Sequence, residues 1–244
     1  MAKPPKALDI VFENRNLVAL NKPSGLITIP DREGKEQSLK DLLLEKYSEI
    51  YTVHRIDRET SGLVIFAKTP ESHRFYNQQF ENRQTIKIYT GFVIGSLQQK
   101  EGTVNAPIAE NMLRRGTMLV HQRGKQAVTD YKVLQDFGVY SYLQFQIHTG
   151  RTHQIRVHTR ELGHPLVADA LYGDGKPLLL STLKSKYNLS KQEWEEKPLL
   201  NRLALHAYQL TITDTDNSVL QLEAPVHKDF KATLQQLEKT SVKK

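Results

Sequence analysis

The sequence predicts an α+β fold: a single domain with a largely antiparallel mixed sheet flanked by helices and loops. The chain has 244 residues, of which 39% are hydrophobic and 25% charged, so it can bury a substantial core. Strand-like and helix-like segments intermix without the regular alternation of a doubly wound sheet. No internal repeat or low-complexity stretch is present, so a repeat architecture is excluded.

The first third of the chain predicts three strands and two helices. Two short strands within residues 10–22 break at residues 13–16 and close at a turn over 23–25. Ser38 is the cap candidate for an amphipathic helix over 38–47, because apolar side chains recur there at helical spacing. The run "GLVIFAKT" has the length and β-branched content of a buried strand, and Pro70 then opens a second helix.

The rest of the chain predicts five strands and two more helices. Strands are expected over 86–95, 127–137 and 140–150, with Gly138 at the turn that joins the last two. Thr152 is the cap candidate for a helix over 152–162, and Gly163 stands just past its end. Two paired strands over 203–213 and 218–225 precede a closing helix over 227–239. We place the domain at residues 10–240 after a tail at 1–9, with the lysine-rich stretch 176–197 as a surface insertion.

Composition narrows the function classes. There are 34 Lys and Arg against 27 Asp and Glu, a net charge of +7 that suits a polyanionic partner without proving one. No cysteine is present, which excludes disulfides, thiolate metal sites and a cysteine nucleophile. Neither a secretion signal nor an apolar run of about 20 residues is present, so we expect a cytoplasmic protein with no membrane partner.

The stretch "VHRIDRETSGLVIFAKT" places one carboxylate, Asp57, between Arg55 and Arg58 and ahead of an apolar strand. An arbitrary aspartate in such a place most often caps a turn or forms a surface ion pair. Here a polar loop meets a strand, where a rigid scaffold commonly presents a reactive group, and the small residues of "TSG" allow close approach of a ligand. The flanking arginines favour an ionised Asp57, which suits a nucleophile or a base better than a general acid.

The second notable stretch, "IHTGRTHQIRVHTRELGHP", carries seven basic side chains. A zinc site is disfavoured, because His148, His153 and His158 are five positions apart rather than three or four and no cysteine completes a set. Arg156 and Arg160 are an i, i+4 pair near His153, which predicts an anion-binding helix face. A solvated basic face is the alternative interpretation.

Together, "HRIDRETSGLVIFAKT" and "TGRTHQIRVHTRELGHPLVADALYG" resemble the RluA-type branch of the RNA pseudouridine synthases. The segments "NKPSGLITIP", "IKIYTGFVIG", "QAVTDYKVL", "RLALHAYQL" and "APVHKDF" agree with the same family, so the resemblance spans about residues 10 to 230. It implies the pseudouridine synthase fold and the isomerisation of uridine to pseudouridine in RNA. It also implies one essential aspartate and no metal or cofactor.

Carried over by motif, the resemblance makes Asp57 the catalytic aspartate and Arg55 the residue that displaces and replaces the flipped uridine. Tyr89 falls where the family has a tyrosine against the uracil, and Arg156 falls on the basic residue that pairs with the aspartate. The same motifs add five expected substrate-binding residues: His54, Arg58, Arg151, His153 and Leu205. Two departures stand out: Gly91 where alanine is common, and Ala168 where glycine is usual.

Extruding a stacked uridine costs a few kcal/mol, which explains the need for an aromatic face such as Tyr89. Asp57 can act at C1′ of the ribose or add to C6 of the base, and both routes stay open. Many relatives carry an extra N-terminal RNA-binding module, whereas only the tail precedes the first strand here. We therefore expect a monomer that finds a tRNA arm or rRNA hairpin through its basic surface, with Lys184 and Lys186 as phosphate contacts. A catalytically silent RNA-binding protein and a cofactor-free hydrolase are the alternatives.

Overall fold

The computed structural model describes residues 8–31, 33–184, 187 and 195–241, and the chain divides into two compact units. Unit 1 consists of residues 1–89, 146–150 and 205–225, and unit 2 of residues 90–145, 151–204 and 226–244. The predicted domain limits, 10–240, stay a prediction. No helix in the described part of the chain is both long and apolar enough to cross a membrane.

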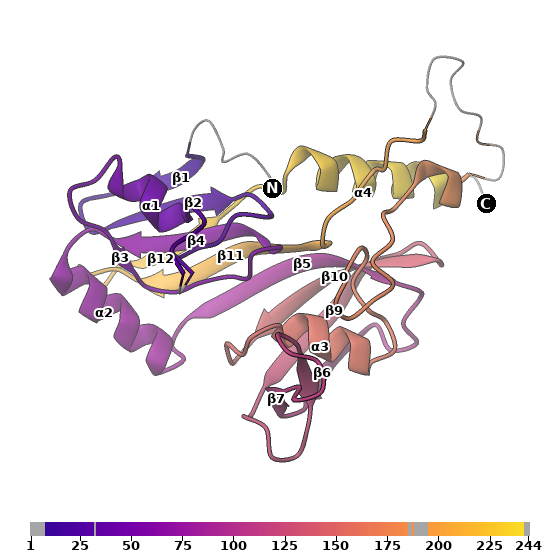
Figure 1. The fold of residues 1–244 in the computed structure, drawn as a ribbon, viewed down its shortest axis with the longest axis horizontal. Helices are drawn as coiled ribbons and strands as arrows, with labels where there is room; N and C mark the ends of the chain where they lie inside the picture. The colour runs from indigo at the N-terminus through magenta and orange to yellow at the C-terminus, as the bar shows by residue number, and fades with distance from the viewer. Residues whose placement is uncertain (1–7, 32, 185–186, 188–194, 242–244) are drawn as a thin grey trace. The chain divides into compact units, whose positions relative to one another are not determined.

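Unit 1 is built on a sheet in the order β1-β2-β4-β11, with β3 paired to β4 and β12 paired to β11 (Figure 1). β4 and β11 run parallel, whereas β1·β2, β2·β4, β3·β4 and β11·β12 are antiparallel. The α+β class with a largely antiparallel mixed sheet is therefore confirmed. The elements are β1 (Ile10–Glu13), β2 (Leu17–Lys22), α1 (Leu39–Leu44), β3 (Tyr51–Thr52), β4 (Ser61–Ala67), α2 (Pro70–Glu81), β11 (Leu205–Thr213) and β12 (Val219–Glu223).

The predicted cap of α1 at Ser38 and the predicted start of α2 at Pro70 are confirmed. The Ser38 side chain accepts the Asp41 N–H at 3.2 Å, and the Asp41 carboxylate accepts the Ser38 N–H at 2.9 Å, which satisfies two donors that the start of α1 leaves open. Thr69 caps α2 in the same way, with Pro70 in its first turn. All residues of β2 and β4 are buried, which explains why β4 reads as one continuous apolar run.

Unit 2 contains an antiparallel pair of β9 and β6, and a separate two-stranded sheet of β7 and β8. Gly138, at φ +81°, turns the chain from β9 to β10, as predicted. A core under α4 joins Phe92 and Phe230, whose ring centroids are 4.6 Å apart. The elements are β6 (Glu101–Asn105), β7 (Ile108–Glu110), β8 (Met118–Val120), β9 (Val128–Asp136), β10 (Tyr140–Ile147), α3 (Gln154–Glu161), the 3-10 turn η1 (Leu180–Thr182) and α4 (Lys228–Ser241); β5 (Ile86–Ile94) begins in unit 1 and ends in unit 2.

One expectation for unit 2 is wrong. Thr152 does not cap α3: the cap is His153, which adopts φ +56° and makes no side-chain cap bond. Gln154 instead folds back, and its side-chain oxygen accepts the Arg151 N–H at 3.1 Å. The surface insertion expected at 176–197 stays a prediction; within it, Leu178 is fully buried and pairs with Leu200. Lys186 and most of the predicted insertion's second half lie outside the described residues.

Candidate active site

The loop that carries Asp57 is fixed by polar contacts from the segment "NKPSGLIT". Lys22 is completely buried, and its ammonium donates to the carbonyls of Pro23, Leu26 and Arg58 at 3.0, 2.7 and 2.9 Å. Ser24 donates to the Glu59 carbonyl at 2.6 Å, and the Gly25 N–H donates to the Arg58 carbonyl at 2.9 Å. A buried ammonium is tolerated only when it is fully hydrogen-bonded. Lys22 therefore holds its own loop, residues 23–26, against the loop that carries Asp57.

The strand that leaves this loop is fixed just as closely. Gly62 of β4 pairs with Ala207 of β11, and a Cβ at Gly62 would lie 2.2 Å from the Ala207 carbonyl oxygen. Beside it, the Ser61 hydroxyl lies 3.0 Å from Nδ1 of His206, and Nε2 of His206 lies 2.9 Å from the Ala224 carbonyl. A carbonyl only accepts, so Nε2 of His206 carries a proton and donates it to the Ala224 carbonyl. Gly62, the glycine of "TSG", is therefore needed for the close approach of β4 to β11, and not only for the approach of a ligand.

Tyr89 lies in unit 1 with Asp57, where its ring packs against the core cluster of that unit. Burial raises the pKa of the Tyr89 phenol, and the negative charge of Asp57 raises it further. The phenol therefore stays protonated at neutral pH. Two of the residues assigned by motif thus interact electrostatically, and the half-buried Asp57 faces a neutral, partly apolar neighbour.

The side chains next to Asp57 differ in what they do. Arg55 is exposed. Arg58 is exposed too, and its guanidinium forms a bidentate pair with Glu36 at 2.6 and 3.1 Å. The sequence suggested that both flanking arginines act on Asp57. In the structure Arg58 is engaged by another carboxylate, Glu36, so the two arginines differ.

His54 has a structural role in addition to its place in the motif. Its Nε2 accepts the Ile65 N–H at 3.1 Å, and its ring stacks on Phe80 with centroids 4.8 Å apart. The pairing of β3 with β4 ends at Thr52 and Phe66. Ile65 is the next residue of β4 in the direction in which β3 runs. The imidazole thus takes an N–H of β4 after the β3 backbone has left the sheet. Burial lowers the pKa of His54 to about 3, and the nearby charge of Lys87 lowers it as well, so the ring is neutral.

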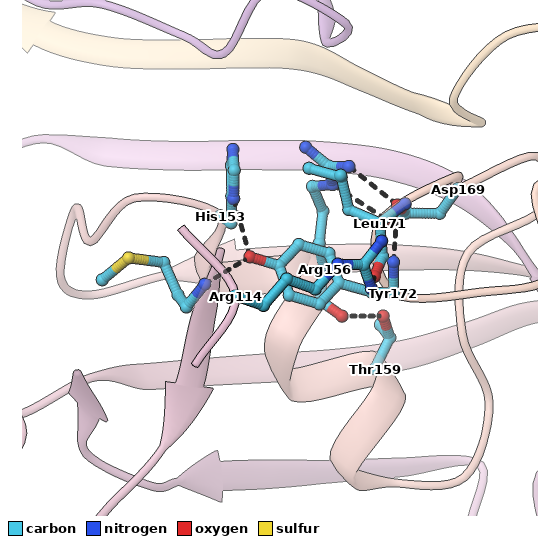
Figure 2. Close-up of polar contacts among 8 residues, drawn as sticks. Arg114, His153, Arg156, Thr159, Asp169, Leu171 and Tyr172 are labelled. Carbon is cyan, nitrogen blue, oxygen red and sulfur yellow. Dashed lines mark hydrogen bonds and ion pairs between the residues drawn. The ribbon is translucent and has the colours of Figure 1, made fainter. Parts of the chain in front are cut away.

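In unit 2, Arg156 is buried on α3 and pairs with a carboxylate that the sequence did not single out (Figure 2). Its Nε and Nη2 donate to the two Asp169 oxygens at 2.8 and 2.7 Å. The Asp169 carboxylate also accepts the N–H groups of Leu171 and Tyr172 at 2.9 and 3.1 Å. Arg156 and the exposed Arg160 consequently do not share an open anion-binding face, and the alternative of a solvated basic face fails for Arg156 as well.

Tyr172 connects Arg156 to His153 (Figure 2). The Arg156 guanidinium carbon lies 5.0 Å from the centroid of the Tyr172 ring, a cation–π contact. The Tyr172 oxygen lies 2.7 Å from Nδ1 of His153 and accepts the Met118 N–H at 2.7 Å. Asp169 and Tyr172 thus orient Arg156 and His153, two of the three basic residues that the motif assigns to unit 2.

The remaining predicted residues are placed as follows. Arg151 donates from Nε to the Gln126 carbonyl at 3.0 Å, and Leu205 is buried at the start of β11. His158 is held by Thr129 and Ala106 at 2.9 and 3.0 Å, and burial lowers its pKa. Within the described residues, no group of three or more potential ligands of the His, Cys, Asp or Glu type could hold a metal ion.

Sequence reasoning missed Lys22, Ser61, His206, Asp169 and Tyr172. Each lies within a segment already quoted for the family resemblance, "NKPSGLITIP", "TSG", "RLALHAYQL" or "ADALYG". Their positions could have been suspected, but their partners could not, because Ser61 and His206 are 145 residues apart in the sequence.

Comparison with known proteins identifies the family of the chain. Residues 16–161 match the family model described as RNA pseudouridylate synthase. The chain is 34% identical over 233 residues to an uncharacterized RNA pseudouridine synthase of Bacillus subtilis, covering 92% of this chain and 70% of that protein. The chain belongs to the RluA-type RNA pseudouridine synthases. Members of this family are isomerases that act on RNA.

Other relatives of this synthase point the same way. It is 36% identical over 235 residues to the ribosomal large subunit pseudouridine synthase D of Nitrosomonas europaea, covering 93% of this chain but only 64% of that protein. The chain therefore spans roughly two thirds of the length of the curated relatives it matches. Among solved structures, human RNA pseudouridylate synthase domain containing 4 aligns with a TM-score of 0.73 and 25% identity, over 94% of this chain and 93% of that one.

Proposed function

We propose that this synthase converts uridine to pseudouridine in a structured RNA, with Asp57 as its essential catalytic residue and without a metal or cofactor. The observation that carries the proposal is the anchoring of the Asp57 loop by Lys22, together with the influence of the Asp57 charge on Tyr89. A reactive carboxylate needs such a rigid support, since a small misplacement of a catalytic group is costly.

In this reaction the bond between C1′ and N1 of uridine breaks, the uracil turns, and a bond between C1′ and C5 forms. The proton on C5 is lost and N1 gains one, so the product is an isomer of the substrate. Asp57 acts at C1′ or adds to C6, and Tyr89 lies against the uracil. Because the detached base must not escape, the site has to exclude water during the turn.

Arg55 is proposed to enter the RNA stack beside the flipped nucleotide, which its exposure permits. Arg156 is proposed, from the motif alone, to sustain the charge of Asp57. The ion pair with Asp169 supports a constant orientation of the Arg156 guanidinium. His153 and Arg151 are proposed to contact the RNA.

The RNA is proposed to be a tRNA arm or a hairpin of ribosomal RNA. The name of the Nitrosomonas relative, ribosomal large subunit pseudouridine synthase D, makes large-subunit rRNA the first RNA to test. The chain's net charge of +7 suits either RNA.

The decisive experiment maps pseudouridines in tRNA and rRNA from cells with and without this chain, and then restores the chain as wild type or as Asp57→Asn. Wild type should restore the missing pseudouridine. Asp57→Asn should not restore it, although its melting temperature should stay within a few degrees of wild type, because its role is chemical. In vitro, turnover of the variant should fall by several decades. Normal turnover by Asp57→Asn would contradict the assignment of Asp57 as the catalytic residue. If the wild-type chain bound RNA but formed no pseudouridine, a catalytically silent RNA-binding protein would be favoured.

A further inference from the structure

The two most exposed large apolar side chains of the described residues lie next to each other. Met112 is 89% exposed and Leu113 is 99% exposed. Both belong to the segment between β7 and β8, residues 111–117, which we call the hairpin tip. Exposed apolar pairs of this kind cost solubility, and they commonly mark a contact surface.

The hairpin tip is a defined structure with its own hydrogen bonds. The Asn111 side chain accepts the N–H groups of Leu113 and Arg114 at 3.1 and 3.2 Å. The Asn111 N–H donates to the Thr117 carbonyl at 2.9 Å, and the Thr117 hydroxyl donates to the Arg114 carbonyl at 2.6 Å. Gly116, at φ +78°, supplies a backbone conformation that other residues rarely adopt. Met112 and Leu113 are therefore presented by a constrained turn.

The base of this hairpin is anchored to the residues that orient Arg156 and His153. The Met118 N–H at the start of β8 donates to the Tyr172 hydroxyl, and Arg114 donates from Nη1 to the Leu171 carbonyl at 3.0 Å (Figure 2). An apolar cluster below these bonds joins Ile108 of β7 to Val157 of α3. The base of the hairpin is thus joined to residues that contact α3 by hydrogen bonds and apolar packing.

Charge indicates which partner fits. Residues 108–125 contain one carboxylate, Glu110, and four Lys or Arg side chains: Arg114, Arg115, Arg123 and Lys125. Proteins that unstack nucleic acid insert apolar side chains such as Leu and Met between bases, while neighbouring basic side chains contact the phosphates. A protein partner would not need this excess of positive charge.

We propose that the hairpin tip is an RNA-binding wedge, in which Met112 and Leu113 insert against a stacked base step while Arg115 contacts the backbone. The RNA is the one on which the family acts, so the choice of ligand rests on the proposed function. The observations on the hairpin tip do not depend on that function. It assigns to unit 2 a second contact with the RNA, distinct from the residues of the motifs.

The test compares Met112→Ser/Leu113→Ser with wild type in equilibrium binding to a fluorescent stem-loop transcript. The transcript is the one that wild type binds most tightly among stem-loops tiled along tRNA and large-subunit rRNA. The double variant should bind about tenfold more weakly with an unchanged salt dependence, because it loses stacking contacts but no charge. Arg115→Gln should lower the salt slope by up to about one unit. Val219→Ser, which changes another exposed apolar residue (71% exposed), is the matched control and should bind as wild type does.

A second readout reports the insertion directly. With 2-aminopurine in the transcript loop, binding of wild type should raise the fluorescence through unstacking, and the double variant should raise it less. If the double variant does not fold, judged by its melting temperature, the single variants Met112→Ser and Leu113→Ser carry the same test with smaller losses.

Binding by the double variant within about twofold of wild type would overturn the proposal. So would a wild-type dimer that the double variant converts to monomers without any change in RNA affinity, because the pair would then be a self-association contact. Turnover by the wild-type chain is measured on the same transcripts. Absent pseudouridine there counts against the proposed function, whereas the affinities alone decide the role of the hairpin tip.

Discussion

Ala168 adopts φ +56°, a left-handed conformation that costs an alanine about 1–2 kcal/mol. It stands where the family usually has glycine, directly before the Arg156 partner Asp169. Ala168→Gly should stabilise the protein by roughly 0.5–1 kcal/mol, because the relieved strain exceeds the added entropy of the unfolded chain. Thermal unfolding should show a rise of about 1–4 °C. Gly138→Ala, at φ +81°, is the control of opposite sign, and a destabilised Ala168→Gly would contradict the strain argument.

Arg156 has a structural and a proposed catalytic role, and the two can be separated. Arg156→Met leaves the buried Asp169 carboxylate without its ion-pair partner, so the free energy of unfolding should fall by roughly 3–5 kcal/mol. Arg156→Met/Asp169→Asn should recover a large part of that loss, because it removes the buried charge as well. Turnover should stay low in both variants if Arg156 supports Asp57.

Denaturant unfolding and single-turnover rates on the same samples distinguish these roles. Recovery of both stability and turnover in the double variant would make Arg156 a structural residue. RNA affinity is the further control, since a phosphate contact would appear in the salt dependence of binding.

At the scale of elements, the way β3 ends predicts a pH dependence. His54 continues the contact of β3 with β4 only as a neutral ring, because Nε2 must accept the Ile65 N–H. Its pKa is about 3 in the folded chain against an ordinary value of 6.5. Below pH 6.5 the unfolded state therefore binds a proton that the folded state does not, so stability is complete above that pH and is lost progressively as pH falls toward 3.

The measurement is the melting temperature between about pH 7 and pH 4.5, where ordinary carboxylates with a pKa of ~3.9 contribute little. His54→Gln should lower stability at pH 7 but flatten its pH dependence, since glutamine offers an acceptor that does not titrate. His121→Gln, at an exposed site, should leave the slope unchanged. An equally steep slope in His54→Gln would assign the effect to another group, with the buried His158 as the first candidate.

The elements also show where sequence reasoning succeeds. Ser38, Pro70 and Gly138 act through neighbours a few residues away, so local patterns predicted the helix starts and the turn they mark. The cap of α3 was predicted wrongly at Thr152, because Gln154 bonds backward to Arg151 and His153 takes the left-handed turn. Short strands such as β3, β7 and β8 were not predicted, since two or three residues carry no periodicity.

At the scale of the whole molecule, the motifs predicted the family, and the assignment of the reactive groups stays a prediction, but the motifs did not reveal the residues that support these groups. Asp57, Tyr89 and Arg156 follow from resemblance. The bonds of Lys22 to three carbonyls and of Asp169 to Arg156 depend on how distant segments meet, which one sequence does not reveal. The same reason explains why Arg156 was expected on an open face although it is buried.

The pairing of β4 with β11 also bears on how the chain matures during synthesis. Ser61 and Leu205 meet at the junction of these strands although they are 144 residues apart. At the usual pace of translation, about 5–20 residues per second, β4 must wait on the order of ten seconds for its neighbour. During that interval a largely apolar strand has an unpaired edge, which makes the nascent chain a natural client for chaperones. The strand that follows the Asp57 loop gains its β11 neighbour only after residue 207 has left the ribosome, so an unfinished chain would lack this support for the loop.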